Sequence, residues 1–341
     1  MTETIIDFSR PPTDKERQQL ERRLQRLENP ALPAHLEALK TKLTDYERTG
    51  GKLRADGLRL RQSFVYLTDP VDTDSSDRTA PPRELRPPAT RISSSRGSAL
   101  RLQLTVIALI QLHRKPGAHA HLAELRIPIA GDSQHTGWSD LVAVLPTDNN
   151  VGGIYHTARD KRARTVRKAL KCLEAAGLIS VPGEPGDRNR FEGFVPLHEA
   201  GTKARGESEE YAIPKTSDAE TFTMPTGFIL NDWLHMLEDS EIAVLLMAAC
   251  HEGAWPDDGL WAFRGEVRLR QYGIHRDPYS SARKTLEWFG LLDVNEIHRH
   301  PDGRAEDDDR RVNRIGINHT GFNAPALPTI RTAIHQQLDR R

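Results

Sequence analysis

The chain has 341 residues and equal numbers of basic and acidic side chains, 48 Lys or Arg and 48 Asp or Glu, so its formal net charge is zero. A chain of this length divides into roughly two to three domains. Zero net charge excludes a general attraction to polyanions, so a nucleic-acid site would have to come from a local cluster of cations.

Several other classes of site and location find no support. The longest apolar run, Ile242 to Cys250, is nine residues, about half of what a membrane helix needs. The opening stretch MTETIIDFSRPP has acids and no basic leader before an apolar block, so it does not indicate a secretory signal. Cys172 and Cys250 stand in apolar helical patterns, which favours reduced buried thiols. We expect a cytoplasmic protein with no membrane partner, cofactor or metal.

Residues 1–68 are predicted to form an antiparallel helical hairpin that ends in a short strand-like run, SFVYL. Thr13 and Glu16 form a T-x-x-E capping box, which marks a helix start. Apolar residues at helical spacing follow on both sides of a break at Pro30 and Pro33: Leu20, Leu24, Leu27, Leu36, Leu39, Leu43 and Tyr46. This stripe either packs on its own chain or forms a homodimer, and the pattern allows both.

Residues 69–97 are rich in Pro, Ser, Asp and Arg and predict a disordered linker. The segment carries Arg83, Arg86, Arg91 and Arg96, which we interpret as part of a solvated tether.

Residues 98–200 are predicted to form a first domain. Ser98 precedes ALRLQLTVIALIQLHRK, whose apolar residues cover more than one face and indicate a helix buried on several sides. Residues 117–152 suggest a short helix and strand segments. A third helix ends at Gly177 and is followed by the extended run LIS, a polar loop and FVPL.

Residues 201–325 repeat this plan. The frame A-x-K-x-L-E-x-x-G-L-x-x-V occurs at Ala169 to Val181 and again at Ala282 to Val294. Helices are predicted at EIAVLLMAAC, at RGEVRLRQYG and from Asp277-Pro278 to Gly290, before LLD, a loop and RIGIN. The order of helices and strands is that of a winged helix, whose third helix enters a DNA major groove. The expected fold is mainly α with small β-hairpin wings (α+β): two winged helix-turn-helix domains, the N-terminal hairpin and a C-terminal tail at 326–341.

The third helix of the first domain has one apolar and one cationic side. At 100° per residue, Val166, Ala169, Leu170 and Leu173 share one arc, and the cations lie opposite. Residues 157–171 hold seven basic residues and one acid, Asp160. Such a stripe suits the phosphates and guanine edges of double-stranded DNA. The candidate DNA-binding residues are Lys161, Arg162, Arg164, Thr165, Arg167, Lys168 and Lys171, with Arg188 and Arg190 in the wing loop.

The stretch RTVRKALKCLEAAGLI resembles the recognition-helix region of GntR-like winged-helix regulators. The matching positions are Thr165, Val166, Arg167, Ala169, Leu170, Leu173, Glu174, Gly177, Leu178 and Ile179. The resemblance implies that residues 165–167 face DNA. Arg162-Ala163 stands where the family often has Ser-Arg. The tandem arrangement of two such domains resembles plasmid replication initiators in architecture.

The third helix of the second domain gives a weaker DNA signal. Tyr279 and Ala282 are expected inward, with Leu286 and Phe289, and the outward side carries small hydroxyls and two cations. The candidate residues are Tyr279, Ser280, Ser281, Arg283 and Lys284. The following loop, residues 298–314, has five Arg and five acids. Its tip is therefore expected to point away from DNA, or this domain binds protein.

Two other function classes match parts of the sequence. His119-Ala120-His121 with Tyr155 would suit a rolling-circle nickase if the histidines lay on a strand, but HLAEL indicates a helix start there. Winged helices can also serve an assembly adaptor through protein contacts. We expect a non-enzymatic, sequence-specific DNA-binding protein that acts as a transcriptional regulator or as a plasmid- or phage-type replication initiator.

Overall fold

The computed structural model describes residues 11–70, 81–94, 98–132, 134–142, 149–151, 154–187, 189–201, 209–251, 259–295 and 313–340. The protein is mainly helical with small antiparallel sheets of two or three strands, which confirms the coarse α+β expectation. Within the described residues, no helix is both long and apolar enough to span a bilayer.

The first two helices form at the predicted residues, but each packs on a different part of the chain. They are α1 (Asp14–Leu27) and α2 (Leu32–Thr44), and both halves of the capping box at α1 are present. Helix α1 packs against α13 (Ala326–Leu338), whereas α2 packs against α6 (Trp138–Val142). The predicted leucine stripe is buried in these contacts. The structure therefore supports the first of the two interpretations, in which the leucine stripe packs on its own chain.

The strand expected at SFVYL lies slightly earlier in the chain. After the short helix α3 (Leu53–Asp56), β1 (Leu58–Arg61) pairs antiparallel with β6 (Thr221–Met224), and Leu58 lies opposite Met224. Residues Gln62–Phe64 form a 3₁₀ turn, η1. The N-terminal segment thus shares a sheet with a strand about 160 residues away.

The prediction of a disordered linker is wrong for residues 81–94. They form η2 (Arg83–Leu85) and α4 (Pro88–Ile92), and Ala89 and Ile92 are fully buried. Thr90 donates its hydroxyl hydrogen to the Tyr272 carbonyl at 2.8 Å. Composition did not predict this ordered segment because its arginines, which suggested a solvated chain, donate hydrogen bonds to backbone carbonyls. Arg86 donates to the Pro81 carbonyl, and Arg91 donates to the Arg86 carbonyl. Residues 71–80 and 95–97, with Arg96, lie outside the described residues.

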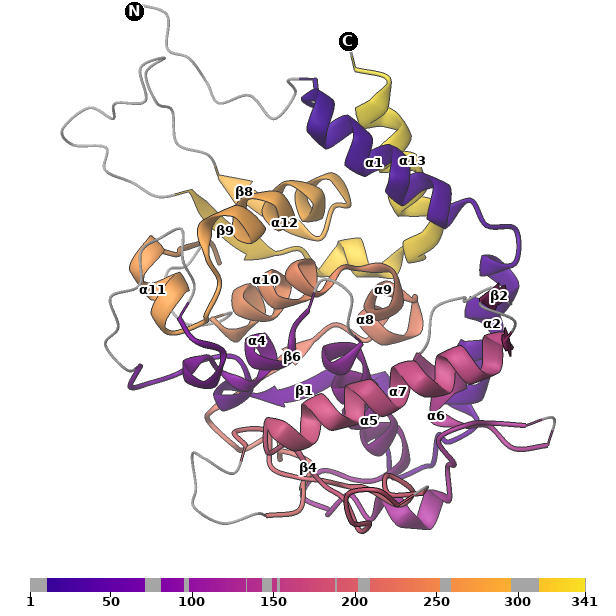
Figure 1. The fold of residues 1–341 in the computed structure, drawn as a ribbon. Coiled ribbons are helices and arrows are strands. Elements are labelled where there is room, and N and C mark those ends of the chain that lie inside the picture. Colours follow the sequence, from indigo (N-terminus) through magenta and orange to yellow (C-terminus); the bar gives the residue numbers. More distant parts are fainter. Residues whose placement is uncertain are drawn as a thin grey trace, which may run out of the picture.

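The first predicted domain has its helices and its helix-to-strand corner where expected. Its elements are α5 (Ala99–His113), η3 (Leu122–Leu125), α6, β2 (Asn149–Val151), β3 (Ile154–His156), α7 (Ala158–Ala175), β4 (Ile179–Ser180) and β5 (Val195–Pro196). Helix α5 is buried on nearly every side, as its pattern predicts. Gly177, at φ +71°, ends α7 in the left-handed region. Figure 1 shows α7 crossing in front of α5.

The second predicted domain continues from β6 through α8 (Gly227–Leu230), α9 (Trp233–Met236), α10 (Asp239–Cys250), β7 (Trp261–Ala262), α11 (Gly265–Arg270), α12 (Arg276–Trp288), β8 (Leu292–Asn295), β9 (Arg314–Ile317) and η5 (His319–Asn323). Strands β7, β9 and β8 form an antiparallel sheet in that order. Gly290, at φ +72°, repeats the corner of Gly177.

The expected C-terminal tail is instead the helix α13. Its apolar residues recur at helical spacing and are buried against α1 and α9: Ala326, Leu327, Ile330, Ala333 and Ile334. In Figure 1, α1 and α13 lie side by side although they come from the two ends of the chain. One contiguous apolar core includes residues of both predicted domains and of the N-terminal segment.

Asp232, just before α9, has an unfavourable environment that gives a testable pH dependence. It has φ +67°, and its buried Oδ1 has no hydrogen-bond partner. Burial raises the pKa of Asp232 to about 6, with Lys40 opposing the shift and Glu37 adding to it. A raised pKa means that stability present below about pH 4 is lost as the pH rises through 6.

Asp232→Asn is therefore expected to raise the free energy of unfolding at pH 7.5 by about 1 to 2 kcal/mol, a value reduced for partial exposure. Asparagine also tolerates the left-handed backbone. Urea unfolding of both proteins at pH 7.5 and 4.5 measures the effect, and the gain should be clearly smaller at pH 4.5. An equal gain at both pH values would point to a backbone effect instead.

Candidate nucleic-acid interface

Helix α7 is oriented by a cap at its start and by an apolar seam on its inner side. The Thr157 hydroxyl accepts a hydrogen bond from the Asp160 amide at 3.0 Å, which fixes the first turn. The inner seam packs against α5 and α6 and consists of Ala163, Val166, Ala169, Leu170 and Leu173, all buried. The predicted apolar side of this helix is confirmed, so its opposite side faces outward.

The outward side of α7, here called the cationic face, consists of Lys161, Arg164, Thr165, Arg167, Lys168 and Lys171. Five of these side chains are exposed, and Lys161 is half-buried. Arg167, Lys168 and Lys171 form no ion pair or hydrogen bond with any residue that the structure describes. Three cations are thus available to an external anion.

The single acid near this face has little effect on it. Hydrogen bonds from Thr157 lower the pKa of Asp160, and Arg164 and Arg159 lower it further. The Thr165 hydroxyl donates to the Lys161 carbonyl at 3.0 Å within the helix. Asp160 therefore stays ionised, but the cations of the face outnumber it and the net charge there is positive.

Arg162 does not belong to the cationic face. It is half-buried, and its guanidinium lies 3.7 Å from the Asp140 carboxylate of α6. The same carboxylate lies 3.6 Å from Lys42 of α2 and accepts from the Gly137 amide at 3.0 Å. The prediction that Arg162 contacts DNA conflicts with this ion pair, and the sequence pattern gave no sign of Asp140 as its partner. In the structure this arginine holds α7 to its neighbours.

The wing residue Arg190 is also engaged within the chain. Its guanidinium lies 2.5 Å from the Glu174 carboxylate, donates to the Gly183 carbonyl at 3.2 Å, and lies over the Phe191 ring. The expected role of Arg190 as a phosphate contact conflicts with these bonds, which attach the loop to the end of α7. Arg188 lies outside the described residues.

Two cations of helix α12, Arg283 and Lys284, are less exposed than the sequence predicted. Ser280 and Ser281 are exposed as expected, and Tyr279 is buried, 7% exposed. Arg283 was predicted outward, but it is only 6% exposed and packs into the domain. Lys284 is half-buried and donates to Glu16 of α1 at 2.9 Å. The predicted direction of Arg283 is wrong because a position two-thirds of the way along α12 is covered by the protein.

The contact between Lys284 and Glu16 gave no signal in the sequence because 268 residues separate the partners. Burial alone would raise the pKa of Glu16, but hydrogen bonds from Lys284 and Thr13 lower it to about 2. Glu16 therefore serves both as the capping-box acid of α1 and as the partner of α12. The mixed-charge loop after β8 falls at 296–312, outside the described residues.

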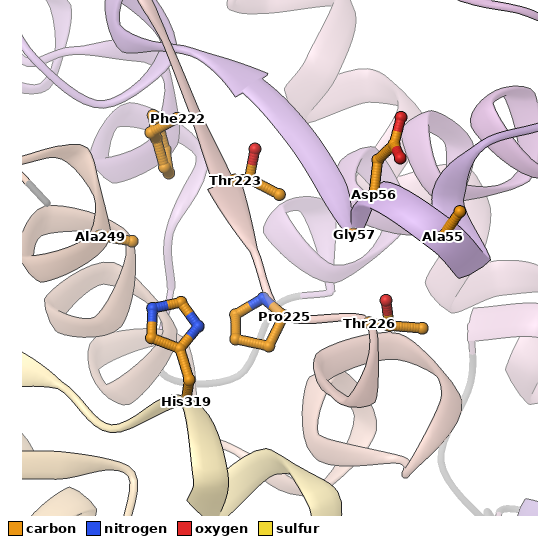
Figure 2. Close-up of a pocket in the computed structure, with 9 residues that line it drawn as sticks. All are labelled: Ala55, Asp56, Gly57, Phe222, Thr223, Pro225, Thr226, Ala249 and His319. Carbon is orange, nitrogen blue, oxygen red and sulfur yellow. The ribbon is translucent and has the colours of Figure 1, made fainter. Parts of the chain in front are cut away.

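Of the pockets away from α7 and α12, one of about 920 Å³ gathers titratable side chains, among them His119, Glu210 and Asp218, and a smaller one does not. The smaller pocket, of about 400 Å³, is lined by Ala55, Asp56, Gly57, Phe222, Thr223, Pro225, Thr226, Ala249 and His319. Figure 2 shows that its two titratable side chains, Asp56 and His319, lie on opposite sides. Over the described ranges, no three His, Cys, Asp or Glu side chains converge as metal ligands. His119 pairs with Ala212 in an isolated bridge, and His121 has φ +43°, so the two are not on a regular strand.

No protein-family model, curated protein or solved structure matches this chain. Function therefore has to be argued from the residues and their geometry.

Proposed function

We propose that the protein binds double-stranded DNA through the cationic face of α7. The observation that carries the proposal is a row of exposed cations on a helix of a chain with zero net charge: Arg167, Lys168 and Lys171, which have no ion-pair partner in the part of the chain that the structure describes. Phosphates supply the matching negative charge, and each contact releases condensed counterions. The buried seam of α7 fixes the helix with these side chains on its outer side.

The order of elements supports a winged-helix interpretation of the second domain. From α10 the order is helix, strand, helix, helix, strand, strand, with the sheet order β7-β9-β8. Five residues, 271–275, connect α11 to α12, close to the short turn of a helix-turn-helix. In the first domain, the β2–β3 hairpin stands between α6 and α7, so the connection there is longer.

Within this proposal the protein is a transcriptional regulator or a replication initiator, and α7 is the recognition helix of the first domain. Thr165 and Arg167 are the residues that its GntR-like stretch assigns to DNA. A homodimer through the N-terminal leucines is not part of the proposal, because these side chains are covered within the chain. The second candidate is an assembly adaptor, which is favoured by one observation: Arg283 and Lys284 of α12 are engaged within the protein.

The test is a salt titration of binding to a random-sequence duplex. The wild-type protein is expected to bind at low salt, with affinity falling linearly on a double-logarithmic plot. Arg164→Ala with Lys168→Ala should reduce the slope by about 1.8 and weaken binding roughly 10- to 50-fold at 0.1 M salt. No binding at low salt would refute the proposal and favour the adaptor.

A matched control variant removes the same charge elsewhere. Lys52 and Lys215 are exposed cations on other parts of the chain. Lys52→Ala with Lys215→Ala should leave the slope and affinity close to wild type. An equal loss in both double variants would mean that total charge, rather than α7, governs binding.

A further inference from the structure

Helix α12 lacks the free cations that a DNA-contacting helix needs along its second half. Arg283 is buried, and Lys284 is paired with Glu16. The exposed side keeps the hydroxyls of Ser280 and Ser281 and, in the first turn, Arg276. Hydroxyls can donate to phosphates, but they do not neutralise them. If the second domain also contacts DNA, another element has to supply charge.

That element is α1, which runs beside the outward side of α12. The two helices and the start of α10 enclose a groove of about 620 Å³. Its floor includes Leu20, Ala282 and Trp288, and its rim carries polar side chains from both helices. In Figure 1, α1 and α12 lie in the same part of the molecule, above α10. A duplex is too wide for this groove, so it would lie across the rim.

The rim side chains of α1 are of the types that bind DNA. Gln19, Arg22 and Arg26 are exposed and recur at i, i+3 and i+7, so they form one line along α1. Arg22 has no ion pair or hydrogen bond within the described residues. Arg26 lies 3.4 Å from Glu238, with its side chain 70% exposed. An exposed pair of this kind contributes at most about 1 kcal/mol, so a phosphate can replace Glu238.

The acids of the groove are neutralised by partners inside it. Glu16 is bonded to Lys284, Glu241 to Arg23, and Glu238 faces Arg26. The lining carries four cations, Arg22, Arg23, Arg26 and Lys284, and three acids, so its formal balance is +1 whichever partner Arg26 takes. The groove therefore favours an anion on its rim.

Helix α1 is also held rigidly enough to act as part of a binding surface. Arg23 donates two hydrogen bonds to Glu241, at 2.6 and 2.9 Å, beneath the rim. Arg17 donates to the Leu338 carbonyl at 2.8 Å, and the leucines of α1 are buried against α13. Binding of a phosphate by the exposed arginines therefore requires little further ordering of the backbone, which keeps the entropic cost of binding low.

We propose that Arg22 and Arg26 of α1, with Gln19, Ser280 and Ser281, form a composite surface that binds the phosphate backbone of duplex DNA beside α12. This rests on the proposed function. Contacts at α7 and at this surface then belong to one bound duplex, and the charge that α12 lacks comes from the N-terminal segment.

The experiment uses the full chain and a duplex selected by it from a random library. Arg22→Ala with Arg26→Ala is expected to lower the salt slope by about one to two. For Arg22→Ala with Arg26→Ala, hydroxyl-radical footprinting should show protection lost at one end of the DNA site. Protection at the other end, which Arg164→Ala with Lys168→Ala removes, should be kept. Arg22→Lys with Arg26→Lys should restore the slope, because a phosphate contact depends on charge.

The outcomes separate this inference from the proposed function. A wild-type slope and footprint in Arg22→Ala with Arg26→Ala, together with lost binding in the α7 variant, would overturn the composite surface alone. If the wild-type protein binds no duplex at low salt, the proposed function and this inference both fail. Both arginines are exposed, so an unchanged thermal midpoint in the alanine variant would verify that the fold is intact.

Discussion

Arg23→Ala is expected to lower the free energy of unfolding by about 3 to 5 kcal/mol. Arg23 is buried, binds Glu241 through two hydrogen bonds, donates to the Met236 carbonyl and lies 5.0 Å from the centre of the Phe289 ring. Burial by itself lowers the pKa of Arg23, but the Glu241 carboxylate raises it above the usual value. The arginine is thus charged at every accessible pH.

The large cost arises because truncation leaves a buried carboxylate without its counter-charge. Glu241 is 2% exposed and, among the described residues, keeps the backbone amide of Glu238 as its one remaining donor. Urea unfolding followed by circular dichroism measures the loss. Arg22→Ala removes a neighbouring exposed arginine and should change stability by less than about 0.5 kcal/mol. Arg23→Met with Glu241→Gln should recover most of the loss, because neither residue is then charged.

A small effect of Arg23→Ala, near that of Arg22→Ala, would contradict the buried pair. It would also weaken the argument that α1 is rigidly anchored beside α12, since the same bonds support both conclusions.

Arg61→Ala is expected to have an effect of similar size, about 3 to 5 kcal/mol at pH 8, and a clear pH dependence. Arg61 of β1 lies 2.6 Å from Glu199, which is fully buried, and donates to the Ala212 carbonyl at 2.8 Å. Burial raises the pKa of Glu199, while Arg61 lowers it. Without Arg61 the pKa of Glu199 rises further.

A carboxyl with a raised pKa contributes stability that is lost as the pH rises through that pKa. The deficit of Arg61→Ala should therefore be larger at pH 8 than at pH 5, where Glu199 is more often protonated. Denaturant unfolding at both pH values provides the measurement. Arg59→Ala, on the same strand but without an acidic partner, is the control and should show no such pH dependence. A deficit independent of pH would indicate lost packing on Tyr211 instead.

These two pairs explain why the N-terminal segment is not a separate unit. Arg23 ties α1 to α10, and Arg61 ties β1 to the end of the first domain. The sequence predicted a helical hairpin whose leucine stripe either packs on its own chain or forms a homodimer, because the leucines repeat at helical spacing. Periodicity identifies which residues are buried, but it carries no information about which surface covers them.

The candidate site shows the same division between local and distant information. The apolar and cationic sides of α7 follow from the helical period, and the structure confirms the buried side of Val166 and Leu170 and the exposure of Lys168 and Lys171. The same reasoning placed Arg283 outward and missed the partners of Arg162 and Arg190. A helical pattern indicates that an arginine points outward, but it does not show whether an acid from another segment binds that arginine.

The sequence by itself determined the longer helices α1, α2, α5, α7, α10 and α12, the glycine corners at Gly177 and Gly290, and the faces of α7, because each depends on residues within a few turns of one another. Tertiary structure alone decided that residues 81–94 are ordered, that α13 covers α1, and that Lys284 meets Glu16. Burial and ion pairing depend on segments that are far apart along the chain, and no local pattern encodes their distance.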